Sequence, residues 1–136
     1  MNIPLVLDAS AAIRVVLEPR NHLPLIEQIQ LATRVCAPTL LISETANTLW
    51  KYRKANVLTS AQCAGLHAEA LTLITFWIDD HALFPEALQT AIDLTHPVYD
   101  AVYLVSARRQ AAKLLTFDKS LYALCIGLNI EAQYCG

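Results

Sequence analysis

The stretch IPLVLDASAAIRVVL, residues 3–17, indicates the class of fold. Its first five residues, IPLVL, are apolar and too few for a helix, so they predict a short strand buried on both faces, as in a parallel sheet. Asp8 and Ser10 follow at once, and both are good capping residues for a helix that continues over residues 11–17. A carboxylate therefore stands where a buried strand passes into a helix.

Short apolar segments and amphipathic segments alternate along the rest of the chain. We expect further strands over residues 35–37, 74–78, 113–117 and 129–132, and helices over 23–31, 38–54, 59–73, 84–94, 97–111 and 119–124. This alternation predicts an α/β fold with three layers, in which helices flank a central, mainly parallel sheet of four to five short strands. No linker or internal repeat interrupts residues 1–136, so we expect a single domain.

The composition is apolar, and it points to a partner. Hydrophobic residues make up 55% of the 136 residues and charged residues only 16%, and the mean hydropathy is +0.39. This leaves little polar material to cover a monomer, so we expect some apolar surface to lie against another chain. The formal net charge is −2, so a nucleic-acid ligand would need a local basic patch or bridging cations.

Several classes of site and location are excluded or disfavoured by what the sequence lacks. The three glycines are far apart, which excludes a P-loop, a G-x-G-x-x-G dinucleotide turn and a G-x-S-x-G nucleophile elbow. No segment has the ~20 apolar residues of a membrane span, and no signal peptide is evident, so we expect a cytoplasmic protein. No C-x-x-C pair occurs among the four cysteines, which we expect to be reduced thiols: Cys36, Cys63, Cys125 and Cys135.

Three carboxylates fall near one edge of the expected sheet. Asp8 follows the first strand and Asp118 follows the strand LLTF, and ligands of open α/β sheets bind beyond the carboxyl ends of the strands. Glu44 lies close to the start of the helix over 38–54, which the preceding strand brings to the same edge. Each has a simpler explanation, because an aspartate after a strand often caps the next helix and Glu44 could belong to a solvated polar face.

Asp100 lies in HPVYDAVYLVSA, residues 96–107, where nearly every other side chain is apolar. An aspartate in a first helical turn gains ~0.3–1 kcal/mol from the helix dipole, which explains why it is tolerated there. Burial of an ionised carboxylate additionally requires a cation, hydrogen bonds or a raised pKa. Its i, i+4 neighbour His96 suggests a rival grouping with Asp93, but Pro97 makes one continuous helix through all three doubtful.

Taken together, the four acids predict a metal site. Several carboxylates at one sheet edge would repel one another unless divalent cations neutralised them, and an all-oxygen set suits Mg²⁺ or Mn²⁺. Such sites activate a water molecule and stabilise a leaving oxygen in phosphodiester cleavage.

Four motifs, in this order and spacing, resemble the PIN-domain family and in particular VapC-type toxins. They are VLDASAAIRVVLEP, SETANTLWKYRK, HPVYDAVYLVSARR and LLTFDKSL, and the resemblance extends from residue 4 to about residue 130. It implies a Mg²⁺- or Mn²⁺-dependent endoribonuclease whose acidic quartet falls on Asp8, Glu44, Asp100 and Asp118. It also implies that Ser10 and Thr116 support these acids and the metal-bound waters.

The resemblance further implies an RNA substrate, a homodimer and a small VapB-like antitoxin that inhibits the enzyme. Basic residues should then contact the RNA backbone, and we expect this of Arg14, Lys51 and Arg108, although cations at helix C-termini also complement the helix dipole. Two alternatives stay open. One is a catalytically weak PIN-type module that binds RNA or protein, and the other is a PIN nuclease that acts in RNA processing or on DNA.

Overall fold

The computed structural model describes residues 2–136, in which five parallel strands form one sheet in the order β3-β2-β1-β4-β5. The strands are β1 (Leu5–Leu7), β2 (Val35–Pro38), β3 (Phe76–Ile78), β4 (Lys113–Thr116) and β5 (Ala132–Tyr134). The helices are α1 (Ala9–Leu17), α2 (Leu23–Leu31), α3 (Leu40–Lys54), α4 (Ser60–Thr72), α5 (Asp80–Leu94), α6 (Val98–Gln110) and α7 (Lys119–Gly127), with a 3₁₀ turn over Pro19–Asn21. The α/β fold expected from the sequence is confirmed.

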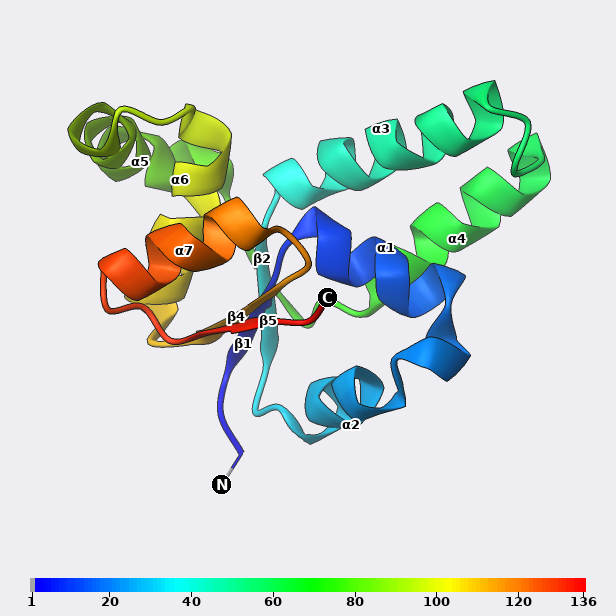
Figure 1. Cartoon of the computed structure of the whole chain (residues 1–136), viewed down its shortest axis with the longest axis horizontal. Helices are drawn as coiled ribbons and strands as arrows, with labels where there is room; N and C mark the ends of the chain where they lie inside the picture. Colours follow the sequence, from blue (N-terminus) through cyan, green and yellow to red (C-terminus); the bar gives the residue numbers. More distant parts are fainter. Residues whose placement is uncertain (1) are drawn as a thin grey trace.

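The direction of the chain across the sheet separates the helices into two layers. From β1 the chain moves outward to β2 and β3, then returns across the sheet to β4 and β5 on the other side of β1. Because parallel crossovers are right-handed, this reversal places α5–α7 on the opposite face from α1–α4. Figure 1 shows α5, α6 and α7 to the left of the sheet and α1, α2 and α4 to its right. The strand order reverses beside β1, where α/β proteins bind ligands.

The apolar run of α6 is explained by its place between two layers. Tyr103, Leu104 and Ala107 pack into the main core against the sheet, whereas Val102 and Val105 pack against α5 in a second cluster. Both faces of the helix are therefore buried, and apolar side chains are needed on each of them. No helix within residues 2–136 is long and apolar enough to cross a membrane.

Local signals set most element boundaries as expected. The side chain of Thr59 accepts from the backbone N–H of Gln62, and the Gln62 side chain accepts in return from that of Thr59, which is the capping box expected at the start of α4. Helices α5 and α6 are separate, because Thr95 adopts a left-handed conformation (φ 51°) and Pro97 precedes α6. The expected break between Asp93 and Asp100 is thus confirmed.

Several boundaries differ from the expectation. Strand β3 begins at Phe76 and not at residue 74, and α7 continues to Gly127 and not only to residue 124. Two further differences have a clear local cause. Helix α5 begins at Asp80 and not near residue 84, because the Asp79 carboxylate caps it by accepting from the backbone N–H of His81 at 3.0 Å. Strand β5 begins at Ala132 and not at residue 129. Asn129 has a left-handed backbone (φ 57°), and the chain must complete this turn after α7 before it can rejoin the sheet.

The buried contacts of α6 with the sheet predict a large loss of stability when they are removed. Leu104 is fully buried, so Leu104→Ala should lower the free energy of unfolding by ~2–5 kcal/mol, as measured by urea denaturation. Leu23→Ala is the matched control, because Leu23 is 62% exposed and its truncation should change the stability by less than ~0.5 kcal/mol. Equal effects of the two substitutions would contradict this description of the core.

Candidate metal centre

Asp8 is the most buried of the four acids, and both of its carboxylate oxygens are hydrogen-bonded. Its side chain is 5% exposed and caps α1 by accepting from the backbone N–H of Ala11 at 2.9 Å. The same oxygen accepts from the hydroxyl of Ser10 at 2.6 Å, and the other accepts from the hydroxyl of Thr116 in a short hydrogen bond. Asp8 therefore both caps α1 and belongs to the candidate site.

Ser10 and Thr116 also bind the backbone that leads to Asp118. The Ser10 hydroxyl accepts from the backbone N–H of Phe117, and the Thr116 hydroxyl accepts from that of Asp118, each at 2.9 Å. Each hydroxyl thus donates to Asp8 and accepts from the loop after β4. This arrangement is consistent with the supporting role that the sequence resemblance implied for both residues.

The buried position of Asp8 disfavours its negative charge. Burial raises the pKa of Asp8 above its ordinary value, and the nearby charge of Asp118 raises it further, while the bonds from Ser10, Thr116 and Ala11 act in the opposite direction. In residues 2–136 no lysine or arginine forms an ion pair with Asp8. Its charge therefore lacks a protein cation.

Glu44 lies in the second turn of α3 and is held by Tyr103 from α6. The Tyr103 hydroxyl donates to a Glu44 carboxylate oxygen at 2.6 Å. Burial raises the pKa of Glu44, as do the charges of Asp8, Asp100 and Asp80, and the bond from Tyr103 partly offsets this rise. The sequence analysis did not single out Tyr103, because this contact joins two helices that are far apart in the chain.

Asp80 is a second residue that the sequence analysis did not single out. Its carboxylate accepts from the backbone N–H of Leu40 at 2.9 Å, and its own backbone N–H donates to the Thr39 hydroxyl at 3.1 Å. Asp80 therefore caps α3 from the neighbouring β3–α5 turn, and it does so where Thr39 makes no capping bond of its own. This contact anchors the start of the helix that carries Glu44.

Asp100 is half-buried and Asp118 is exposed. Each carboxylate forms hydrogen bonds with residues close to it in the sequence. Asp100 lies in the first turn of α6, and its carboxylate is 2.7 Å from Nε2 of His96. Asp118 caps α7 by accepting from the backbone N–H groups of Ser120 and Leu121 at 2.8 and 3.3 Å. The hydroxyl of Ser120 donates to the same oxygen at 2.9 Å.

The four acids occupy one edge of the sheet, uppermost in Figure 1, where α1, α3, α6 and α7 begin. Their mutual effects on pKa link Asp8 with Asp118 and Glu44 with Asp8 and Asp100. Among the described residues, however, no three histidine, cysteine, aspartate or glutamate side chains converge tightly enough to form a ready-made ion site. Glu44 and Asp100 each bind a protein donor instead, through one oxygen.

The three basic residues predicted to contact RNA lie at different distances from this edge. Arg14 is on α1 beside Phe117, with its guanidinium carbon 5.3 Å from the centre of that ring. Lys51 is exposed on α3, two turns beyond Glu44. Arg108 lies at the far end of α6 and bonds Glu86 on α5 at 3.0 Å, which explains its presence without a ligand.

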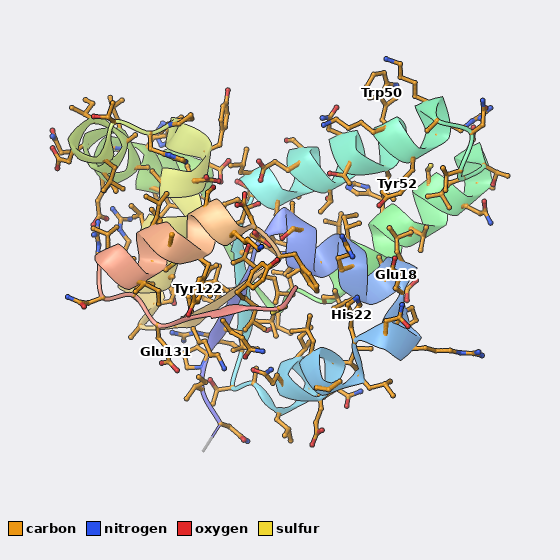
Figure 2. The ribbon with its side chains drawn as sticks, viewed as in Figure 1. Glu18, His22, Trp50, Tyr52, Tyr122 and Glu131 are labelled. Carbon is orange, nitrogen blue, oxygen red and sulfur yellow. The ribbon has the colours of Figure 1, made fainter. Side chains whose placement is uncertain are left out.

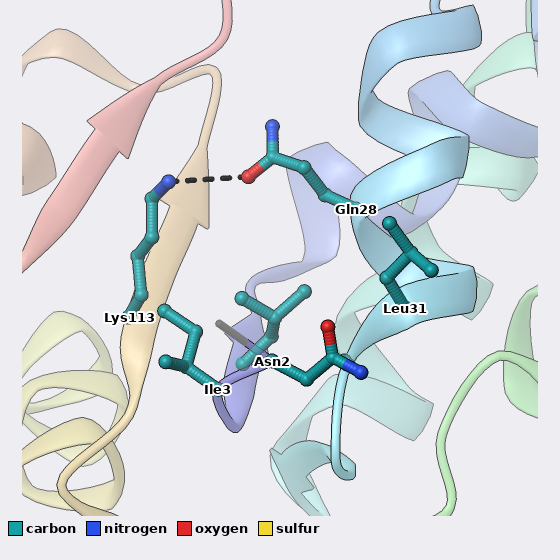
Figure 3. A pocket seen from close by; sticks show the side chains of 7 residues that line it. Asn2, Ile3, Gln28, Leu31 and Lys113 are labelled. Atoms are coloured by element: carbon teal, nitrogen blue, oxygen red, sulfur yellow. Dashed lines mark hydrogen bonds between the residues drawn. The ribbon is translucent and has the colours of Figure 1, made fainter.

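A hollow at the opposite edge of the sheet is unrelated to the acids. It has a volume of about 240 Å³ and lies between α2 and the start of β4. Figure 3 shows Lys113 on one side of it, where its ammonium group donates to the side-chain oxygen of Gln28 at 3.1 Å. This hollow contains no carboxylate, so it cannot supply the same chemistry.

Comparison with protein families identifies the fold. The model of the PIN domain matches residues 5–127. The chain belongs to the PIN-domain family. Members of this family are typically metal-dependent nucleases, and the matched PIN region includes all four acids. No curated protein matches the chain significantly.

Solved structures show the same PIN fold at low identity. PAE2754 from Pyrobaculum aerophilum is 24% identical, with a TM-score of 0.70 over 90% of this chain and 86% of that chain. A chain in the structure of VapBC2 from Rickettsia felis, bound to a DNA fragment from their promoter, is 12% identical, with a TM-score of 0.67 over 96% of this chain and 97% of that chain. The expected likeness to a VapC-type fold is thus confirmed.

The raised pKa of Asp8 predicts how stability depends on pH when metal is absent. In EDTA at low pH, Asp8 is protonated in both the folded and the unfolded chain, so its ionisation does not lower the free energy of unfolding. As the pH rises above the ordinary value of 3.8, the unfolded chain releases the proton first, so stability falls until the folded carboxyl also ionises. Asp8→Asn should therefore raise the melting temperature at pH 7 by a few degrees, and by less at pH 4.

Differential scanning calorimetry in EDTA at the two pH values measures this effect, since each kcal/mol corresponds to roughly 3–5 °C for a domain of this size. Asp93→Asn is the control, because Asp93 is an exposed acid on α5 that bonds only Gln89. A lower melting temperature for Asp8→Asn at pH 7 would show that the hydrogen bonds outweigh the cost of burial.

Proposed function

We propose that this PIN domain is a metal-dependent endoribonuclease of the VapC toxin type, which hydrolyses RNA phosphodiester bonds with a metal-activated water. The observation that carries the proposal is the buried carboxylate of Asp8 at the sheet edge, which is hydrogen-bonded at both oxygens, lies near other acids and has no protein cation beside it among the described residues. Asp8, Glu44, Asp100 and Asp118 are the proposed metal ligands and catalytic residues.

The side chains at this edge fit Mg²⁺ or Mn²⁺. The donor set consists of carboxylates, which hard divalent cations prefer. Hydrogen bonds from the described residues reach only one oxygen each of Glu44, Asp100 and Asp118, so the second oxygen of each is available to a cation. Burial and mutual repulsion raise the pKa of Asp8 and Glu44, and a bound cation relieves both effects. When bound, the metal supplies an activated water and neutralises charge on the scissile phosphate.

The side chains that contact the proposed metal ligands have distinct roles. Ser10 and Thr116 fix the orientation of the Asp8 carboxylate by donating to one oxygen each, which reduces the reorganisation needed when the cation binds. Tyr103 fixes the orientation of the Glu44 carboxylate in the same way, by donating to one of its oxygens. Asp100 must share its carboxylate with His96 or give up that bond, because the two are in contact at 2.7 Å.

We further propose an antitoxin partner and a homodimer. The similarity in fold to a chain of VapBC2 supports the antitoxin. The dimer is supported by exposed apolar residues four apart on α5, which are Phe84, Leu88 and Ile92. Copurification of the chain with the product of a small adjacent reading frame tests the first partner, and sedimentation of the chain alone tests the second.

Loss of an acid should abolish metal-dependent cleavage. We expect Asp8→Asn and Asp100→Asn each to lower the rate of RNA cleavage with Mn²⁺ by about a hundredfold or more, equivalent to ~2.7 kcal/mol of transition-state stabilisation. Gel analysis of a labelled RNA measures the rate, with EDTA as the blank. The matched control, Asp93→Asn, makes the same chemical change on an exposed face of α5 and should retain full activity.

A metal titration separates the nuclease from a binding module that does not cleave. Millimolar Mn²⁺ should raise the melting temperature of the native chain, because the ion binds the folded state alone, and should raise that of Asp8→Asn much less. Full cleavage activity in either acid variant would refute the proposed site. Absence of both cleavage and a thermal shift in the native chain would favour the binding module.

A further inference from the structure

A groove lies directly beside the acidic residues, between α1, α3 and the loop that joins β4 to α7. Its volume is about 410 Å³, and its lining includes Ser10, Arg14, Thr48, Tyr52, Phe117 and Asp118. Ser10 also binds the Asp8 carboxylate, and Asp118 is itself a proposed metal ligand. A molecule in this groove would therefore touch the edge of the proposed metal site.

A second hollow of about 380 Å³ continues the groove along α3. Thr48 and Tyr52 line both hollows, and Lys51 lines the second. The two hollows thus form a path that leads away from the acids, with Tyr52 at their junction. Figure 2 shows Tyr52 on the side of α3 that faces α1 and α4, whereas Trp50 projects from the opposite side of the helix.

Arg14 is held at the groove by an aromatic ring. Its guanidinium group lies over Phe117, and the ring of His22 packs edge-on against the same Phe117 at 5.1 Å. The ion pair of Arg14 with Glu18 is long, at 3.7 Å, and the Arg14 side chain is 48% exposed. Such an exposed pair is weak, so the guanidinium keeps donors for an incoming anion.

We propose that the path is the binding track for a single-stranded segment of RNA, in which Tyr52 stacks on a base next to the scissile phosphate. Arg14 binds the phosphate on the side of the acids, and Lys51 binds a phosphate in the second hollow. The inference rests on the proposed nuclease function and adds to it a residue, Tyr52, that contacts the substrate beside the proposed metal site. Unpaired bases are the form of RNA that offers a free face to an aromatic ring, and cations beside that ring meet the backbone.

Fluorescence anisotropy with two probes tests the track. The first probe is a fluorescein-labelled oligouridylate of about ten nucleotides, and the second is the same strand with abasic residues throughout. Both are titrated with Mg²⁺ present onto the Asp100→Asn protein, in which cleavage is blocked. We expect Tyr52→Leu to weaken binding of the oligouridylate about tenfold and to leave binding of the abasic strand unchanged.

Three further variants separate stacking from charge and from loss of structure. Tyr52→Phe keeps the aromatic face and should retain the affinity. Arg14→Gln should weaken both probes and reduce the salt dependence of log Kd by about one. Trp50→Leu is the matched control, because Trp50 is an exposed aromatic with Lys54 over its ring, on the other side of α3, and should have no effect. The melting temperature of each variant reports folding.

Each alternative outcome overturns the track in a recognisable way. Equal losses for both probes in Tyr52→Leu would show that the residue does not stack on a base. If Tyr52→Leu instead releases a copurifying protein and leaves RNA affinity intact, the groove is a protein-binding surface. RNA cleavage by the native chain with unchanged binding in Tyr52→Leu refutes only the track. If the native chain does not cleave RNA and the Asp100→Asn protein does not bind it, the track and the nuclease are both refuted.

Discussion

The hydrogen bonds around the buried carboxylate of Asp8 hold the candidate site together. One oxygen is bound by α1 and Ser10, and the other by Thr116, which lies 108 residues further along the chain on β4. The two hydroxyls then accept from the backbone that follows β4. A single side chain thereby fixes the relative positions of β1, β4 and the helices that begin after them. The orientation of Asp118 follows from this network, because its backbone N–H is one of the donors.

The same arrangement places function and stability in opposition. Burial and neighbouring acids raise the pKa of Asp8 and Glu44, so ionisation of these carboxyl groups, which a cation requires, is less favourable in the folded chain without metal than in water. Proteins tolerate such tension at functional sites when the surrounding packing is strong. Here that packing is provided by the fully buried strand β1 and by α6, which is buried on two faces, against the sheet and against α5. Helix capping accounts for Asp8 and Asp118 singly, but it does not account for their grouping with Glu44 and Asp100 without a lysine or arginine partner among the described residues, and this grouping points to a ligand.

Sequence patterns were sufficient for the parts of the structure that depend on local order. The passage from IPLVL to Asp8, the capping box of Thr59 and Gln62 and the position of Glu44 near a helix start were all predictable. The grouping of four acids at one edge followed from topology, and their quartet role came from the family resemblance. The contact of Tyr103 with Glu44 joins residues 59 positions apart, and only the packing of α6 beside α3 creates it. No periodicity within either helix contains that information.

The cap that Asp80 provides for α3 has a consequence for how variation spreads through this fold. The exchange of hydrogen bonds between Asp80, Leu40 and Thr39 links two turns that are 40 residues apart. The start of α3 is therefore only as well ordered as the turn after the edge strand β3. An insertion or a grafted loop at that turn would remove this cap from the helix that carries Glu44 while leaving every residue of α3 intact. Chimeras of related domains should accordingly exchange the turn and the helix as one inherited unit.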